Sequence, residues 1–168
     1  MVSTQGHPAD LPIMPADIRP SQVIGLVEKV GENLERIKTS KLANELGADL
    51  TILPSILKVG EMLGLILEVN GEIQLTQKGL DFQLAPRHNV KMLTDALSEI
   101  EPFRTALELA AKQESIVAAQ VANALLERGI EWHYQEEVNV SIINALLINW
   151  TIVAGLLMYD KSGGFRKT

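Results

Sequence analysis

The chain has 168 residues, of which 46% are hydrophobic and 21% are charged, and it contains no cysteine. This composition excludes a disordered chain, a disulfide scaffold, a thiolate metal site and a cysteine nucleophile. The net charge of −6 opposes nonspecific attraction to nucleic acid, because neutralising phosphates requires clustered lysine and arginine.

Residues 1–20 contain four prolines and little periodic apolar pattern, which predicts an extended N-terminal arm. They lack the basic start and the continuous apolar run of a secretory signal. No window reaches the ~18 apolar residues of a membrane-spanning helix. We therefore expect a cytoplasmic chain without membrane insertion.

Three helices are predicted next along the chain. Ser21 is a suitable N-cap for a helix over residues 22–35, in which Val23, Val27 and Val30 repeat at helical spacing. A short helix over 40–46 ends at Gly47. A third helix is capped by Thr51 and ends at Gly64.

A β-hairpin follows over residues 65–76. Asn70-Gly71 suits a turn with two positive φ angles, and Ile73 and Leu75 alternate with polar residues as a half-buried strand requires. With a helix predicted over 77–84, this order is that of a winged helix-turn-helix, and we place that domain at residues 21–85.

Residues 86–168 form the third predicted region. Helices are expected over 90–100, 103–112, 115–128 and 136–153, and a second hairpin over 155–168. We predict a mainly α (α+β) fold, with a winged helix followed by a helical subdomain that ends in a hairpin. A degenerate second winged-helix unit is the alternative for this half.

Four segments, at residues 14–28, 41–46, 53–65 and 74–79, resemble the AAA-associated domain, a C-terminal extension of ABC-transporter ATPases of the nitrate, sulfonate and bicarbonate uptake class. The resemblance runs from about Met14 to Tyr159. It implies a regulatory or assembly role beside a transporter ATPase, in which a separate chain would act in trans or would have taken on another role. ATP hydrolysis would belong to the ATPase, since no GxxxxGK[ST] phosphate loop occurs in this sequence.

Catalysis is not indicated. His7, His88 and His133 do not stand at metal-ligand spacing with another strong ligand, and no nucleophile-elbow sequence is present. We expect a non-catalytic domain without metal or cofactor.

DNA binding by a winged-helix transcriptional regulator is the alternative function. A recognition helix needs residues that read base edges, yet Lys58 is the one cation between Thr51 and Gly64, and the wing tip offers Glu68 and Glu72. DNA binding would require a basic stripe built in space from Arg36, Lys41, Lys58 and Lys78.

Seven residues are candidate contacts with a protein partner or with DNA: Arg36, Lys41, Ser55, Lys58, Lys78, Trp132 and Tyr134. Trp150 is instead predicted to lie in the core, on a helical face with Ile143, Leu146, Leu147 and Val153. The apolar stretch over residues 138–158 exceeds what one small domain hides on a single face, which predicts homodimerisation through the C-terminal helices.

Overall fold

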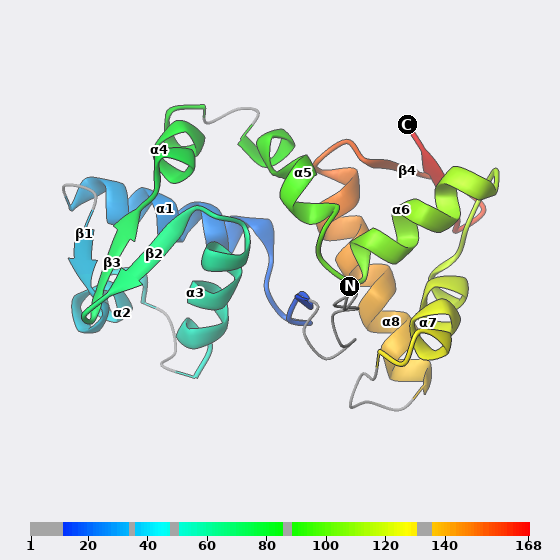
Figure 1. The fold of residues 1–168 in the computed structure, drawn as a ribbon, viewed down its shortest axis with the longest axis horizontal. Helices are drawn as coiled ribbons and strands as arrows, with labels where there is room; N and C mark the ends of the chain where they lie inside the picture. Colours follow the sequence, from blue (N-terminus) through cyan, green and yellow to red (C-terminus); the bar gives the residue numbers. More distant parts are fainter. Residues whose placement is uncertain (1–11, 34–35, 48–50, 86–88, 131–135) are drawn as a thin grey trace, which may run out of the picture. The chain divides into compact units, whose positions relative to one another are not determined.

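The computed structural model describes residues 12–33, 36–47, 51–85, 89–130 and 136–168, and the chain is mainly α with two small antiparallel sheets (Figure 1). It divides into two compact units. One unit is Asp17–Ala96, and the other combines the N-terminal segment as far as Ala16 with Leu97–Thr168. This division falls after Ala96, whereas the sequence-based boundary is placed after Ala85.

The Asp17–Ala96 unit contains helices and a three-stranded sheet in the following order: α1 (Pro20–Glu32), β1 (Arg36–Lys38), α2 (Thr39–Leu46), α3 (Leu53–Met62), β2 (Ile66–Val69), β3 (Glu72–Leu75), α4 (Gln77–Leu84) and the 3-10 helix η2 (Asn89–Leu93). The predicted order of helix, short helix, helix, hairpin and helix is thus confirmed. The winged-helix assignment stays an interpretation of this order.

Helix α1 begins two residues earlier than predicted. Pro20 occupies its first turn, where the missing N–H costs nothing, and the Gln22 side chain accepts the Arg19 backbone N–H at 2.8 Å. Ser21 is therefore a helical residue and not the N-cap. The apolar stripe of α1 is buried as expected, and it contacts α3 and α4.

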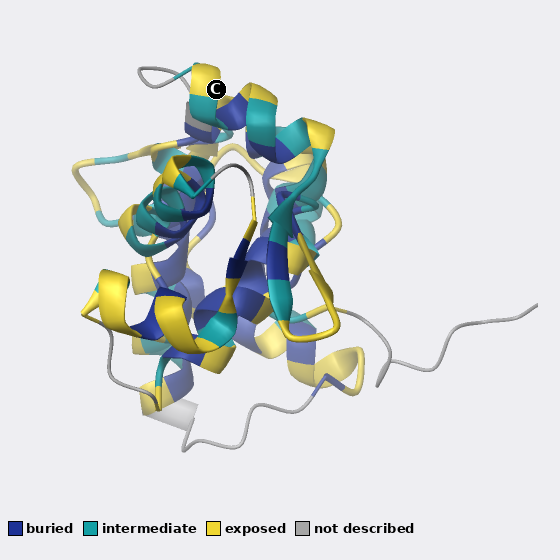
Figure 2. Ribbon diagram, turned by 90° about the vertical axis from the view of Figure 1, so that its left-hand side faces the viewer, coloured by how far each residue is buried: buried dark blue, intermediate teal, exposed yellow. Residues whose placement is uncertain are grey.

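The hairpin forms as the Asn-Gly pair predicts. Asn70 and Gly71 have φ angles of 52° and 77°, and β2 pairs antiparallel with β3. Strand β1 is an element that the sequence patterns did not indicate; it pairs with the other edge of β3. Figure 2, which looks onto this unit, shows exposed residues along its outer surface and buried residues toward its interior.

Thr76 joins the base of the hairpin to α4. Its hydroxyl donates to the Gly64 carbonyl at 2.5 Å and accepts the Gly79 N–H at 2.9 Å, so it caps α4 while holding the start of the hairpin. Its own N–H donates to the Leu65 carbonyl at 3.0 Å. The hairpin is thereby held against the helix that follows it.

The second unit contains α6 (Phe103–Lys112), α7 (Ala118–Glu127), α8 (Glu136–Leu146), the π-helical segment η3 (Leu147–Ile152), β4 (Leu157–Tyr159) and β5 (Phe165–Lys167). Strands β4 and β5 pair antiparallel, which confirms the second predicted hairpin. The expected helix over 90–100 is shorter: η2 is followed by the single turn α5 (Thr94–Leu97).

Trp150 lies in the core of this unit, as predicted. It is fully buried, and its ring centroid lies 6.4 Å from that of Phe103. Val153 does not share its environment, because 52% of Val153 is exposed. The reason is η3, whose wider turn rotates the following residues away from the face that continuous α-helical spacing predicts.

The described part of the predicted N-terminal arm is packed. Ile13 forms a parallel bridge with Glu101: the Met14 N–H donates to the Glu101 carbonyl at 2.9 Å, and the Glu101 N–H donates to the Pro12 carbonyl at the same distance. Met14 is fully buried. An extended segment with single anchoring residues has no helical or strand periodicity, which is why the sequence pattern indicated an unpacked arm.

Candidate protein-binding groove

Strand alternation separates the two faces of the three-stranded sheet. Cross-strand pairing puts Ile37, Ile73 and Glu68 in one row, and the first two are buried, so this row belongs to the core face. Glu68 stands at the open edge of that row. Arg36 and Leu67 pair with opposite sides of Gln74 and point to the outer face.

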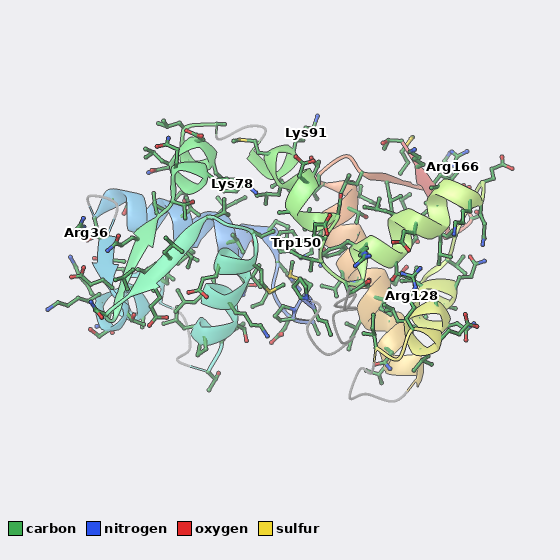
Figure 3. The ribbon with its side chains drawn as sticks, viewed as in Figure 1. Arg36, Lys78, Lys91, Arg128, Trp150 and Arg166 are labelled. Carbon is green, nitrogen blue, oxygen red and sulfur yellow. The ribbon has the colours of Figure 1, made fainter. Side chains whose placement is uncertain are left out.

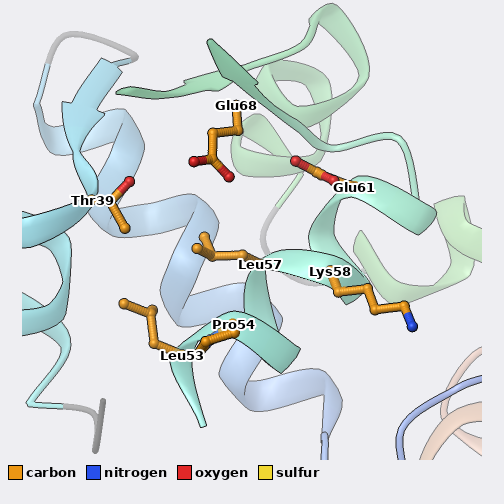
Figure 4. Close-up of a pocket in the computed structure, with 7 residues that line it drawn as sticks. All are labelled: Thr39, Leu53, Pro54, Leu57, Lys58, Glu61 and Glu68. Carbon is orange, nitrogen blue, oxygen red and sulfur yellow. The ribbon is translucent and has the colours of Figure 1, made fainter. Parts of the chain in front are cut away.

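A groove lies between α3 and the core-face edge of β2. We call it the α3–β2 groove; its volume is about 440 Å³, and it is lined by Thr39, Leu53, Pro54, Leu57, Lys58, Glu61 and Glu68 (Figure 4). Leu53, Pro54 and Leu57 supply apolar surface. Glu61 and Glu68 bring carboxylates to the rim from two different elements.

Local sequence explains this arrangement. Pro54 is accommodated in the first turn of α3, where it stays exposed, while the helix buries Leu53, Ile56 and Leu57 against the unit. Lys58 and Glu61 follow at positions that helical spacing turns toward solvent. The groove thus has an apolar floor and a charged border.

The four predicted cations do not form one basic stripe. Arg36 lies on the outer face of the sheet, and Lys58 lies at the groove. Lys41 is already paired with two neighbouring residues. Its ammonium lies 3.5 Å from a Glu45 carboxylate oxygen and donates a hydrogen bond to Asn33 Oδ1 at 2.9 Å. Figure 3 shows Arg36 on β1 and Lys78 well away from it, on α4.

The remaining candidate contacts are placed as follows. Ser55 is half-buried in the first turn of α3, beside the groove but not among its lining residues. Trp132 and Tyr134 lie outside the described residues, as do the three histidines. Within the described ranges, no group of three or more metal-ligating side chains is close enough to hold an ion.

Sequence reasoning did not single out Glu61 and Glu68 as partners in one site, or Leu53 and Leu57 as its floor. The alternation of β2 and the helical period of α3 contain this information separately. Their meeting depends on the packing of the hairpin against α3, which pattern alone does not predict.

The second unit has one charged cluster of note. Arg128 Nη1 donates to the Thr105 hydroxyl at 2.8 Å, and Arg128 Nη2 donates to Glu108 at 2.5 Å. Arg104 Nε lies 3.4 Å from the same carboxylate. Partial burial raises the pKa of Glu108, but the two guanidinium groups outweigh it and hold that pKa below its ordinary value. The cluster ties α6 to the end of α7.

Comparison with known families identifies the chain. The model of the C-terminal AAA-associated domain matches residues 40–160, which is more than half of the sequence, and the chain belongs to this family. No curated protein and no solved structure matches it. Among the described helices, none is long and apolar enough to cross a membrane.

Proposed function

We propose that this chain is a non-catalytic accessory domain that binds an ABC-transporter ATPase of the nitrate, sulfonate and bicarbonate uptake class and regulates or assembles it. The family match over residues 40–160 is the observation that supports this most strongly, since the family is named for its association with AAA-type ATPases. The sequence resemblance from Met14 onward supports the transporter class.

The surface chemistry favours a protein partner over DNA. The exposed side of α3 borders an apolar groove with carboxylates from Glu61 and Glu68, and these would repel a phosphate backbone. Arg36 projects from the opposite face of the sheet, so it cannot extend a basic contact begun by Lys58. A mixed patch with dispersed cations is what an assembly role predicts.

We also propose that the chain forms a homodimer through α8. The sequence has no charged residue from Val138 to Tyr159, and α8 with η3 leaves a row exposed at helical spacing: Val138, Ser141, Ala145 and Ile148. A row without charges can pack against its own copy without bringing like charges together.

Isothermal titration of the purified chain into the purified ATPase subunit of such a transporter tests the main proposal. We expect saturable binding with a defined stoichiometry, together with a change in the rate of ATP hydrolysis when the complex forms. The absence of binding to the ATPase would refute the proposed function, and ATP hydrolysis by the chain alone would refute its non-catalytic character.

A further inference from the structure

Among the residues that the structure describes, no cation pairs with the carboxylates at the α3–β2 groove. Among the described residues, neither Glu61 nor Glu68 has an ion-pair partner, although both stand at the rim of one groove. Lys58 does not fill this role: in Figure 4 its ammonium points away from Glu68 and from the apolar floor. The border of the groove is therefore negative where it meets the apolar surface.

The opposite wall is apolar, and Pro54 is its exposed residue. Leu53 and Leu57, of which 4% and 8% are exposed, form the floor beneath it. A volume of about 440 Å³ falls within the range of about 300–1,000 Å³ that is typical of ligand pockets. Such a floor favours apolar side chains, because their surface is exposed to water when they are free and is removed from water when they bind.

These two observations specify one kind of occupant. We infer that the α3–β2 groove receives an apolar protein segment that has a lysine or arginine next to its apolar side chains. The apolar side chains would cover Leu53, Pro54 and Leu57, and the cation would reach Glu61 and Glu68. This inference rests on the proposed function, because it assigns that segment to the partner ATPase.

Charge decides between this occupant and the other macromolecules that bind winged-helix surfaces. A nucleic acid would bring phosphates to two unpaired carboxylates, and an acidic segment would do the same with its own carboxylates. An amphipathic helix with a basic flank satisfies both halves of the groove, since helices commonly lay an apolar face into a hydrophobic groove.

A peptide probe tests the groove without the ATPase. The probe is a synthetic amphipathic helix with leucines on one face and two flanking arginines, and its twin has glutamates in place of the arginines. Methyl NMR of the full chain follows the signals of Leu53 and Leu57. We expect the basic peptide to shift these signals and to bind at least about tenfold more tightly than its acidic twin.

Variants then separate a specific contact from general attraction to an acidic protein. The double variant Glu61→Gln/Glu68→Gln should lose most of the preference for the basic peptide. The matched control Glu28→Gln/Glu114→Gln removes the same charge from exposed positions that do not line the groove and should keep the preference. Equal binding of both peptides, equal behaviour of both double variants, or shifts that avoid Leu53 and Leu57 would overturn the inference.

Titration of the ATPase with the same proteins distinguishes the two proposals. If the wild-type chain binds the ATPase and Glu61→Gln/Glu68→Gln binds it more weakly by about tenfold, both stand. If the two bind equally, the groove inference fails and the proposed function survives. If the wild-type chain does not bind the ATPase, the proposed function and the assignment of the segment to the ATPase both fail, whatever the peptides do.

Discussion

Among the described glycines, Gly79 leaves the least room for a β-carbon beside backbone atoms. A β-carbon at this position would lie 2.0 Å from the Leu65 carbonyl oxygen, which itself accepts the Thr76 N–H. Backbone cannot yield as a flexible side chain can, so the first turn of α4 needs glycine in order to approach the base of the hairpin.

Replacing Gly79 with alanine should therefore destabilise the chain by about 2–3 kcal/mol, since the hairpin and α4 must separate to admit the methyl group. Gly25→Ala is the matched control. Gly25 lies in α1 with no atom near its missing β-carbon, so alanine there should stabilise by about 0.5–1 kcal/mol. Urea unfolding of both variants measures the difference, and equal midpoints would contradict this account of the α4 contact.

Arg128 ties the end of α7 to α6 through its side chain. Arg128→Gln removes its bonds to Thr105 and Glu108 and leaves the buried Thr105 hydroxyl without that donor. We expect the unfolding free energy to fall by about 1–2 kcal/mol, because a hydrogen bond to a charged group contributes more to stability than an exposed ion pair does. Arg166→Gln, which breaks a 3.9 Å exposed pair with Asp160, should cost less than about 0.5 kcal/mol.

The same cluster predicts a pH dependence. The pKa of Glu108 is lowered in the folded chain. Burial raises this pKa, but the hydrogen bond to Arg128 and the charges of Arg128 and Arg104 lower it by a larger amount. A depressed carboxyl pKa stabilises the fold above the unfolded value near 4.5, and that stabilisation is lost as the pH falls through the folded value. Thermal unfolding between pH 7 and pH 3 should show a smaller acid loss in Arg128→Gln; an identical acid limb would count against the cluster.

At the scale of elements, local signals predicted the hairpins and most helices. The Asn70-Gly71 turn required positive φ angles and has them, and α6 begins and ends where its apolar period predicts. Strand β1 escaped prediction because its outer residues Arg36 and Lys38 are charged, and only Ile37 reports a core face. Three residues are too few for alternation to be recognised.

The C-terminal helix shows how a change of helical period alters a surface. Continuous α-helical spacing correctly buries Ile143, Leu146 and Trp150, but η3 interrupts that spacing and leaves Val153 exposed. A π-helical segment has no dependable sequence signal. The first three residues of the exposed uncharged row, Val138, Ser141 and Ala145, lie on the regular helix α8, and Ile148 extends the row into η3.

The proposed homodimer depends on the uncharged row of α8 and η3. Ala145→Arg places a cation in the centre of the uncharged row and should shift the chain from dimer to monomer in sedimentation velocity at tens of micromolar, as a rough working range. Ala119→Arg, at an exposed position of α7, should leave the dimer intact. A wild-type chain that sediments as a monomer would refute the proposal.

At the scale of the whole molecule, the two compact units have different surface chemistry. The Asp17–Ala96 unit presents the α3–β2 groove, whose carboxylates have no ion-pair partner among the described residues, and the other unit presents the uncharged row of α8 and η3. Composition predicted an acidic chain and disfavoured DNA, and helical periodicity predicted the α-rich fold. It could not predict the groove, because Glu61 and Glu68 meet the leucine floor only through packing between separate elements.

Protein recognition is the central claim, and one parallel titration tests it directly. Fluorescently labelled chain is titrated by anisotropy with the transporter ATPase subunit and, separately, with mixed genomic DNA fragments, each at low and at physiological salt. We expect saturable binding to the ATPase that persists at physiological salt, and no binding to DNA even at low salt. Tight DNA binding that weakens steeply with salt, with no binding to the ATPase, would contradict this claim and identify a winged-helix transcriptional regulator.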